Sequence, residues 1–494
     1  MRRAAELDQG VPAEEEDDDG RGSEVRWWCR RTTFIRALVL AAAMVIALQA
    51  GTTNAFNTIA THIQNDTGLS NGQITLLSSV GIIGTSFTMF AGLFNDRFGA
   101  MLTSLIGAVL TSSGYLAMSF TDKGTYPAMV ASLTIIGFGS GASFLGALST
   151  GLKVIPGYPG VGVALVGACM SISLALTNGI VEFDREVLGC AEDDCWPYYL
   201  RSLAVTTATF LFAPSFILCL LPPDADSKAK HPQRPTPANH TIQGDDWSEQ
   251  ELARDLFAPA GEVPQAVLVD EALKAGQTDS PVSLLHSLNA LGNLFFWLLI
   301  FGYFSGIGSA VAIITSNKEI WVTFTGGEHA GWAVQITTGF SIANTIANVL
   351  SGWASDFLWT KFKFARHKLL ALALLLDFVV FTVLVGLSYG IAHPSTAAQI
   401  VFVVCLMSVG FCFGTYLSLV PIIVGDYYGY VNFGLYFGYI QLGALVAVFL
   451  VPNLAQVIKD SMGDFNVIFV ALLVCLGVSF AGIFLKRPTP IGHD

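Results

Sequence analysis

Two short polar motifs recur in the chain with the same internal spacing, 260 positions apart. The first reads GLFNDRFG from Gly92 to Gly99, and the second reads GWASD from Gly352 to Asp356. Glycine lets two helices approach closely, while the acid four residues later can cap the next helix and accept hydrogen bonds from a neighbouring one. These residue types predict a helix contact that forms and breaks as a gate. Its members are Gly92, Asp96, Arg97, Gly99, Gly352 and Asp356.

A single acid, Asp377, stands in the middle of a hydrophobic run, within the segment LLLDFVV. A charge at the centre of a bilayer costs roughly 3 kcal/mol or more, so this side chain should face protein or water, or carry a proton. Two interpretations stay open. Asp377 is either a proton site or a neutral acid that bonds to a neighbouring helix.

Several other chemistries have no motif in this sequence. It contains no HExxH or GxSxG segment, no Walker-type phosphate loop, no CxxC pair and no basic stretch of the kind that binds nucleic acid. We therefore expect no catalytic residues, no cofactor, no metal site and no nucleic-acid partner. Energy for any transport should come from a solute gradient or from a coupled ion, of which a proton is one candidate.

The elements that position these residues follow from composition. The chain has 494 residues, of which 53% are hydrophobic and 13% charged, with a mean hydropathy of +0.58. Soluble domains carry about 25% charged residues, and a helix of about 20 apolar residues crosses a bilayer. Apolar runs lie at 34–56, 74–94, 99–120, 127–151, 160–181, 200–221, 290–314, 331–353, 367–390, 397–423, 431–453 and 464–485. The sequence predicts an all-α membrane protein with twelve transmembrane helices in a lipid bilayer.

The runs form two sets of six, separated by a polar stretch that is rich in proline and mixed charge. We expect a disordered acidic and basic tail over 1–32, a six-helix bundle over 33–221, a linker over 222–289, a second bundle over 290–486 and a tail over 487–494. Of the 25 Lys and Arg residues, twenty fall on the side that carries both termini and the linker. Because positive loops stay cytoplasmic, both termini and the linker are predicted to be cytoplasmic. The sequence does not separate a plasma membrane from a vacuolar-type membrane.

Two features of the opposite loops are compatible with this orientation. The sequon at Asn65 lies in the first outer loop, where glycosylation is permitted, although an unused sequon fits equally well. Cys190 and Cys195 share the outer loop between runs five and six, so a local disulfide and two free thiols are both open.

With twelve runs, a long central linker and a repeated motif, the chain resembles the major facilitator superfamily. Members of that family carry Gly-x-Leu-x-Asp-Arg-x-Gly after their second helix, and Gly92, Asp96, Arg97 and Gly99 are in place here. Ala100 and Met101 replace the basic pair that follows in the family. The resemblance covers about residues 33–486 and implies two pseudo-symmetric six-helix bundles that rock about a central site.

A narrower resemblance rests on three further segments. These are Gly306 to Ser309, Gly137 to Gly141 and Asp426 to Gly434, which look like the nodulin-like branch and the fungal monocarboxylate-transporter-like proteins near it. That kinship implies a solute carrier whose proposed cargoes include carboxylates and iron-related solutes. It does not select one of them.

The resemblance also implies that the first, fourth, seventh and tenth helices line the central cavity. Polar candidates on them are Gln49, Asn54, Asn57, Ser140, Ser143, Tyr303, Ser305, Ser309 and Tyr416. Bonding between helices is the alternative role for each. By the same resemblance the ninth helix is peripheral, which favours the structural interpretation of Asp377.

The sequence is therefore interpreted as a secondary active or facilitative transporter of a small solute that works by alternating access as a monomer. The alternatives are a carrier of an iron-related solute and a non-transporting receptor or scaffold with the same fold. Measured flux separates the last of these from the first.

Overall fold

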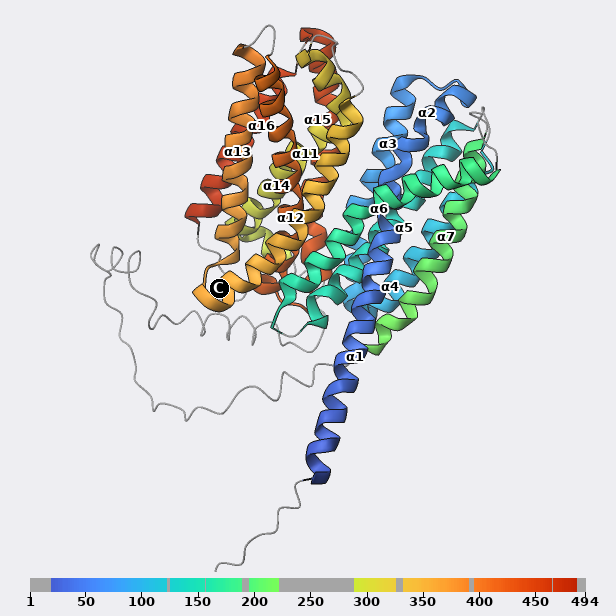
Figure 1. Cartoon of the computed structure of the whole chain (residues 1–494), viewed down its shortest axis with the longest axis vertical. Helices are drawn as coiled ribbons and strands as arrows, with labels where there is room; N and C mark the ends of the chain where they lie inside the picture. Colours follow the sequence, from blue (N-terminus) through green and yellow to red (C-terminus); the bar gives the residue numbers. More distant parts are fainter. Residues whose placement is uncertain are drawn as a thin grey trace, which may run out of the picture.

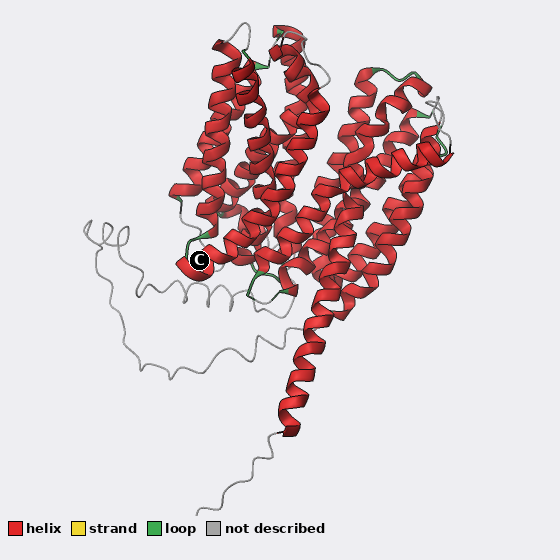
Figure 2. Ribbon diagram, in the orientation of Figure 1, coloured by secondary structure: helices red, strands yellow, loops and turns green. Residues whose placement is uncertain are grey.

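The computed structural model describes residues 19–121, 125–155, 157–188, 195–221, 288–325, 332–390, 395–463 and 465–486. Over these ranges all regular elements are helices, joined by short turns (Figure 2). The expected N-terminal tail spans 1–32, and its described part is helical from Asp19 as the start of α1. Residues 1–18 and 487–494, and most of the predicted linker, lie outside the described residues.

The helices fall into two sets, each packed mainly within itself (Figure 1). The first half comprises α1 (Asp19–Ala50), η1 (Gly51–Ala55), α2 (Phe56–Thr67), α3 (Asn71–Ser86), α4 (Met89–Met118), α5 (Tyr126–Val154), α6 (Pro159–Leu188), α7 (Trp196–Ile217) and η3 (Leu218–Leu220). The second half comprises η5 (Leu288–Gly292), α11 (Leu294–Thr325), α12 (Trp332–Phe362), α13 (Arg366–Gly390), α14 (Thr396–Tyr428), α15 (Phe433–Met462) and α16 (Asn466–Leu485).

The predicted second and third spans meet inside α4, which doubles back at Gly99. This glycine has a φ of 86° within an otherwise helical segment, a conformation that other residues adopt only at a cost. On the wall formed by α5, a Cβ on Gly137 would lie 2.2 Å from the Gly81 carbonyl oxygen, and one on Gly139 would lie 2.6 Å from the Thr111 nitrogen. Gly81 in α3 and Thr111 in α4 thus lie at the same level of the bundle, in helical segments that run in opposite directions.

The predicted first span is divided rather than continuous. A short 3-10 segment, η1, separates α1 from α2, where the sequence reads GTTNA between two apolar stretches. In a bilayer, the carbonyl groups that such a break releases need other donors. Hydroxyl groups of the first half donate to these carbonyl groups.

The outer surface of both halves is apolar. Nine stretches of the described helices are long and apolar enough to cross a membrane, and one of them, Gly72–Met118, contains the turn at Gly99. Large side chains such as Val205, Ile400 and Val474 are exposed on the outside of the bundles. Such a surface would be a liability in water and is ordinary against lipid tails. The protein is an integral multi-pass membrane protein.

Helix ends are set by local sequence signals. Ser70 and Gln73 form a reciprocal capping box at the start of α3, and the Ser395 hydroxyl caps α14. Gly463 closes α15 in the left-handed conformation. These signals fix the lengths of helices and so the level at which their polar residues lie.

Candidate gate and solute pathway

The two halves touch mainly through two pairs of helices, α4 with α15 and α12 with α6, and α14 with α6 and α15 with α3 add smaller contacts. Figure 1 shows α12 and α6 side by side between the bundles. In each pair, the helix that carries a Gly-x-x-x-Asp motif meets the first turn of a helix from the opposite half. We call the α4 and α15 contact the first latch and the α12 and α6 contact the second latch.

In the first latch, Asp96 caps a helix of the other half. The Gly434 nitrogen donates to Asp96 Oδ1 at 2.9 Å, and the Leu435 nitrogen donates to Oδ2 at 2.8 Å. The side chain of Asn432, which precedes α15, does not cap that helix. A carboxylate at a helix N-terminus satisfies free amides and complements the helix dipole. Asp96 therefore stabilises α15 only while the two halves stay together.

Close approach at the first latch depends on glycine. A Cβ on Gly92 would lie 2.0 Å from the Gly434 carbonyl oxygen, and a Cβ on Gly438 would lie 2.6 Å from the Met89 Cα. No real Cβ tolerates such distances, so a larger residue would push α4 and α15 apart. The glycine of the motif sets the separation at which its aspartate reaches the neighbouring helix.

The second latch repeats this arrangement with the roles of the halves exchanged. The Val161 nitrogen, in the first turn of α6, donates to Asp356 Oδ2 at 2.9 Å. A Cβ on Gly352 would lie 2.4 Å from the Gly160 carbonyl oxygen, and one on Gly160 would lie 2.5 Å from the Gly352 carbonyl oxygen. The second-half motif thus holds the first half as the first-half motif holds the second.

The second latch also contains a buried ion network. Arg366, at the start of α13, donates from Nη2 to Asp356 Oδ1 at 2.7 Å and from Nη1 to both oxygens of Asp426 at 2.7 and 2.6 Å. Tyr430 donates to Asp426 Oδ1 at 3.2 Å. One cation serves two carboxylates, which leaves a net negative charge beside the positive end of α6. Asp356 is thereby held from both sides.

The surroundings of Asp96 are simpler. The Asn95 amide is 3.5 Å from Asp96 Oδ1, and Ser149 donates to the Asn95 side-chain oxygen at 3.2 Å. Lys153, at the end of α5, acts on Asp96 electrostatically. Arg97, the next residue, is exposed and lies over the Phe98 ring. The motif arginine therefore points away from the contact between the halves.

A layer of neutral polar side chains joins the halves next to the second latch. The amides of Asn344 and Asn348 on α12 both donate to Ser171 Oγ on α6, at 3.1 and 3.0 Å. Ser418 on α14 donates to the Asn348 side-chain oxygen at 2.8 Å. These hydrogen bonds join α6 of the first half to α12 and α14 of the second. We call these four residues the amide bridge.

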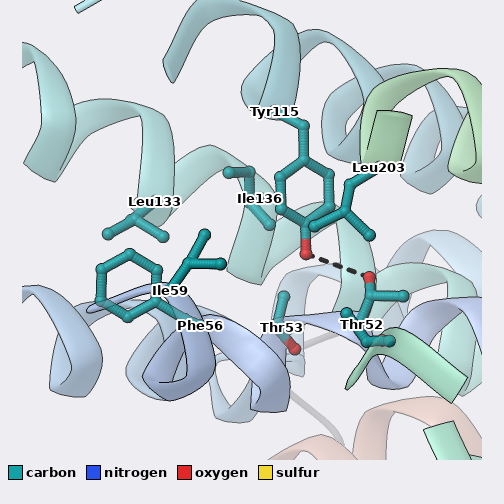
Figure 3. A pocket seen from close by; sticks show the side chains of 9 residues that line it. Thr52, Thr53, Phe56, Ile59, Tyr115, Leu133, Ile136 and Leu203 are labelled. Atoms are coloured by element: carbon teal, nitrogen blue, oxygen red, sulfur yellow. Dashed lines mark hydrogen bonds between the residues drawn. The ribbon is translucent and has the colours of Figure 1, made fainter. Parts of the chain in front are cut away.

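The break at η1 is stabilised by hydroxyl groups of the first half. Ser140 on α5 donates to the Ala50 carbonyl, the Thr52 hydroxyl donates to the Gln49 carbonyl at 2.9 Å, and Tyr115 donates to Thr52 Oγ1 at 3.0 Å (Figure 3). These bonds replace helix bonds that the break removes. Ser140 therefore serves the backbone of α1.

A small cavity lies against this break. Figure 3 shows the apolar side chains of Phe56, Leu133 and Ile136 around it, with the Tyr115 hydroxyl bonded to Thr52. Its free volume is about 10 Å³, which is about the space that one water molecule needs. A transported solute does not fit there, so this cavity is a packing defect beside the break and not the solute site.

All four predicted cavity residues of the second half make contacts inside that half. Ser309 donates to Asp377 Oδ2 at 2.7 Å, and Tyr416 donates to the same oxygen at 3.0 Å. Ser305 is 2.8 Å from the Ser479 hydroxyl on α16. Tyr303 is buried on α11 and interacts with Gln441 on α15.

The predicted cavity residues of the first half have mixed positions. Ser143 packs against α4 and donates to the Ser104 carbonyl at 3.4 Å. Gln49 is 3% exposed, and its side-chain oxygen has no hydrogen-bond partner among the described residues. The side chains of Asn54 and Asn57 lie outside the described residues.

The predicted outer-loop features are described in part. Cys195 is disulfide-bonded, but Cys190 lies outside the described residues, so the pairing of these two cysteines stays a prediction. Asn65 is exposed near the end of α2. Beside it, Asp66 accepts a hydrogen bond from the Trp196 ring nitrogen at 3.0 Å, which ties the end of α2 to the start of α7.

Arg366 and three members of the amide bridge are the parts of the site that the sequence did not mark as functional. Ser171, Asn348 and Ser418 are isolated polar residues in apolar spans, and Arg366 counted only as a positive charge of an inner loop. A signal was available for Asn344 and Asn348, since amides four residues apart share a helix face.

Comparisons with known proteins agree with this architecture. A family described as Major Facilitator Superfamily matches residues 39–325, more than half of the chain. The riboflavin transporter RibJ of Trypanosoma brucei brucei is 23% identical over 253 residues, which are 48% of this chain and 43% of RibJ. The match therefore spans less than half of that relative's length.

Two solved structures have a similar fold. The proton:xylose symporter XylE, bound to 6-bromo-6-deoxy-D-glucose, has a TM-score of 0.65 at 14% identity, over 91% of this chain and 95% of XylE. FucP in the outward conformation has a TM-score of 0.54 at 16% identity, over 91% of this chain and 99% of FucP. Identities this low show the fold alone. The family and these proteins are transporters rather than enzymes, and the chain described here belongs to the major facilitator superfamily.

Proposed function

We propose that this protein moves a small polar solute across the bilayer by alternating access, with the two latches as its gate at one end. The observation that carries the proposal is the exchange of caps: Asp96 and Asp356 each stabilise the first turn of a helix from the opposite half. Such a contact is lost when the halves tilt apart and is regained when they close. The gate therefore has two arrangements that a bound solute can bias.

The solute should meet neutral hydrogen-bonding groups rather than a strong charge. The amide bridge joins the halves through Asn344, Asn348, Ser171 and Ser418, and in the first half the buried side-chain oxygen of Gln49 has no hydrogen-bond partner within the described part of the chain. The amide donors of these groups can bind hydroxyl, amide or carboxylate oxygens without a charge of their own. The transported solutes named for RibJ and XylE are polar, which supports this class without selecting a member of it.

The finer assignments are part of the same proposal. We place both termini and the latches on the cytoplasmic side because the positive residues gather there, and the two halves are the rocking units. A single chain contains both latches, so a monomer suffices. Kinship with the nodulin-like and monocarboxylate-transporter-like branch would add carboxylates and iron complexes to the solutes worth testing.

The test is flux in proteoliposomes that contain the purified full-length chain. Counterflow is measured with a panel of labelled pentoses, deoxyhexoses, riboflavin, short monocarboxylates and iron complexes. We expect saturable counterflow for one class and a changed rate in a variant with both Asp96→Asn and Asp356→Asn. Gly386→Ala is the matched control, because a Cβ at that position meets nothing within 4 Å.

A folded protein without counterflow for any member of the panel would contradict the transport proposal and favour a receptor or scaffold. Folding is checked by the size-exclusion profile and by a cooperative thermal transition. Counterflow that is identical in the double variant would leave transport standing but remove the latches from its gate.

A further inference from the structure

A buried carboxyl group lies inside the second half, away from both latches. Asp377 on α13 is fully buried, and its Oδ2 lies within hydrogen-bond distance of Ser309 on α11 and Tyr416 on α14, at 2.7 and 3.0 Å. Its other oxygen, Oδ1, has no hydrogen-bond partner among the described residues. Two hydroxyl groups therefore converge on one oxygen while the second oxygen is left alone.

The number of hydrogens available for these hydrogen bonds indicates which protonation state of Asp377 the arrangement favours. Ser309 Oγ is also 2.8 Å from the Gly306 carbonyl oxygen, and Tyr416 Oη is 3.3 Å from the Ala373 carbonyl oxygen. Each hydroxyl has one hydrogen and must choose between its two acceptors. If Asp377 carries a proton, it donates to Ser309, Ser309 donates to Gly306, and Tyr416 donates to Asp377. Every hydrogen is then used and no negative charge is buried.

The ionised form has little to stabilise it. Both hydroxyls would have to turn to Oδ2, and the described ion pairs join other residues, among them Arg366 with Asp356 and Asp426. The titratable or charged residues on the helices packed against α13 are Cys405, Cys412, Tyr416, Asp426, Tyr427 and Tyr428 on α14, Tyr303, Lys318 and Glu319 on α11, Cys475 on α16, and Asp356 and Lys361 on α12, and α13 itself carries Arg366, His367, Lys368 and Tyr389. Among the described residues, none of these places a cation on Asp377, and burying an unpaired charge is strongly disfavoured.

We propose that Asp377 is a proton-binding site, which holds its proton in this conformation and releases it only when helix movement exposes the carboxyl group to water. Protonation and helix position are then linked, because the proton leaves in one arrangement and binds in the other. The site would take a proton from water and return it to water, with no other reactant.

The helices around Asp377 are built to move. A Cβ on Gly306 would lie 2.5 Å from the Tyr416 ring, so α11 and α14 touch directly where both reach Asp377. Pro421 lies inside α14 and removes the backbone bond to Leu417, next to Tyr416. A bend at either point changes the distance between Asp377 and its two hydroxyl partners.

One helix connects the proton site with the contact between the halves. Tyr416 on α14 faces Asp377, and two residues later Ser418 donates to Asn348, which in turn bonds Ser171 of the first half. A shift of α14 that accompanies proton release would therefore strain the amide bridge. This part of the inference, the coupling of protons to transport, rests on the proposed function.

Proton binding itself is tested without any solute. Infrared spectra of the purified full-length protein in lipid are recorded during a pH titration and read at the carbonyl stretch of protonated carboxylic acids. We expect a band at neutral pH that is absent in Asp377→Asn. Equal bands in the two proteins at neutral pH would mean that Asp377 is ionised, and would overturn the proposal.

Matched variants test the hydrogen-bond network. Ser309→Ala and Tyr416→Phe should shift the Asp377 band, while Ser305→Ala and Tyr303→Phe should not, because those residues contact Ser479 and Gln441. All four variants keep the charge of the protein and the shape of the side chain. A band that responds to none of them, or equally to all four, would contradict the assignment.

The coupling role is tested with whichever solute shows counterflow in the panel. Asp377→Asn mimics the protonated acid, so it should keep counterflow and lose at least tenfold of the accumulation driven by a pH gradient. Undiminished accumulation would remove Asp377 from coupling. If no solute shows counterflow in the unaltered protein, the proposed function fails while the infrared result still decides proton binding.

Discussion

The contact between α4 and α15 and the contact between α12 and α6 follow one plan but hold their acids differently. Asp96 reaches the amides of Gly434 and Leu435 with neutral Asn95 beside it. Asp356 reaches Val161 while Arg366 holds it from behind and also binds Asp426. The first latch is thus a cap whose acid Lys153 influences electrostatically, whereas the second is a cap fixed within a buried ion network.

In the proposed mechanism, this difference indicates which of the two acids would lose more of its contacts when the halves separate. Releasing Asp96 from α15 returns a half-exposed carboxylate to water. Releasing Asp356 from α6 leaves Asp356 still paired with Arg366 inside the second half. The ion network thus keeps the second acid in place while the halves part, so the latch can close again on the same geometry. The first acid has no comparable support.

The largest expected effect comes from the cation of the second latch. Arg366→Ala leaves two carboxylates without their partner in a buried site, and removal of one member of a buried pair costs about 3 to 5 kcal/mol. Arg97→Ala is the matched control, because Arg97 is exposed and its loss should change stability by about 0.5 kcal/mol or less. Thermal and denaturant unfolding in lipid-like micelles measure both.

Arg366→Lys should recover only part of that loss, since an ammonium cannot span two carboxylates as a guanidinium does. If Arg366→Ala and Arg97→Ala unfold alike, the second latch contains no stabilising network and the comparison between the latches fails.

The glycines give the next largest effect, and it should be similar in the two latches. Gly92→Ala and Gly352→Ala each place a Cβ about 2 Å from a carbonyl oxygen of the facing helix, and overpacking of this kind costs about 1 to 3 kcal/mol. The halves should part at the latch end. Distances between spin labels on the ends of α4 and α15, and of α12 and α6, report that separation.

Gly386→Ala on α13 is the control, since the added Cβ meets nothing within 4 Å and should stabilise the helix by about 0.5 to 1 kcal/mol. Unchanged label distances in Gly92→Ala and Gly352→Ala would show that close packing of glycines does not hold the latches.

A smaller effect is expected when the caps lose their charge but keep their shape. Asp96→Asn keeps an acceptor oxygen but loses the charge at the start of α15, which should cost about 1 kcal/mol. Combined with Asp356→Asn, the loss should differ from the sum of the two single losses, because either latch alone holds the same pair of bodies. The fraction of closed protein is measured with the same spin labels in the unaltered protein, the two single variants and the double variant, which together form a double-mutant cycle. Strict additivity would mean that the latches open independently.

Much of this gate could be anticipated from residue spacing, but its partners could not. The spacing of Gly92 and Asp96, repeated at Gly352 and Asp356, indicates a close helix contact with a cap. The groups that receive the cap are backbone amides at Gly434, Leu435 and Val161, and no side chain marks a backbone amide in a sequence.

The sequence also does not determine how each apolar helix is rotated about its own axis. Where a helix is apolar on all sides, its hydrophobic pattern does not say which face meets which neighbour. Ser309 and Tyr416 were therefore placed in the central cavity by resemblance, whereas the structure places them against Asp377. The break at η1 was hidden for a similar reason, because two threonines in an apolar run do not interrupt its hydropathy.

The smallest expected effect concerns the amide bridge, which stands beside the second latch and has no equivalent hydrogen bonds described at the first. Ser171→Ala removes the acceptor of both Asn344 and Asn348, and loss of such a bond costs about 0.5 to 1.5 kcal/mol. Ser112→Ala is the control, since Ser112 bonds only to the Ala108 carbonyl of its own helix. We expect the closed population to fall in Ser171→Ala and to stay unchanged in Ser112→Ala. A fall that Asn348→Ala does not reproduce would mean that Ser171 acts through packing of α6, and the asymmetry between the latches would then rest on Arg366 alone.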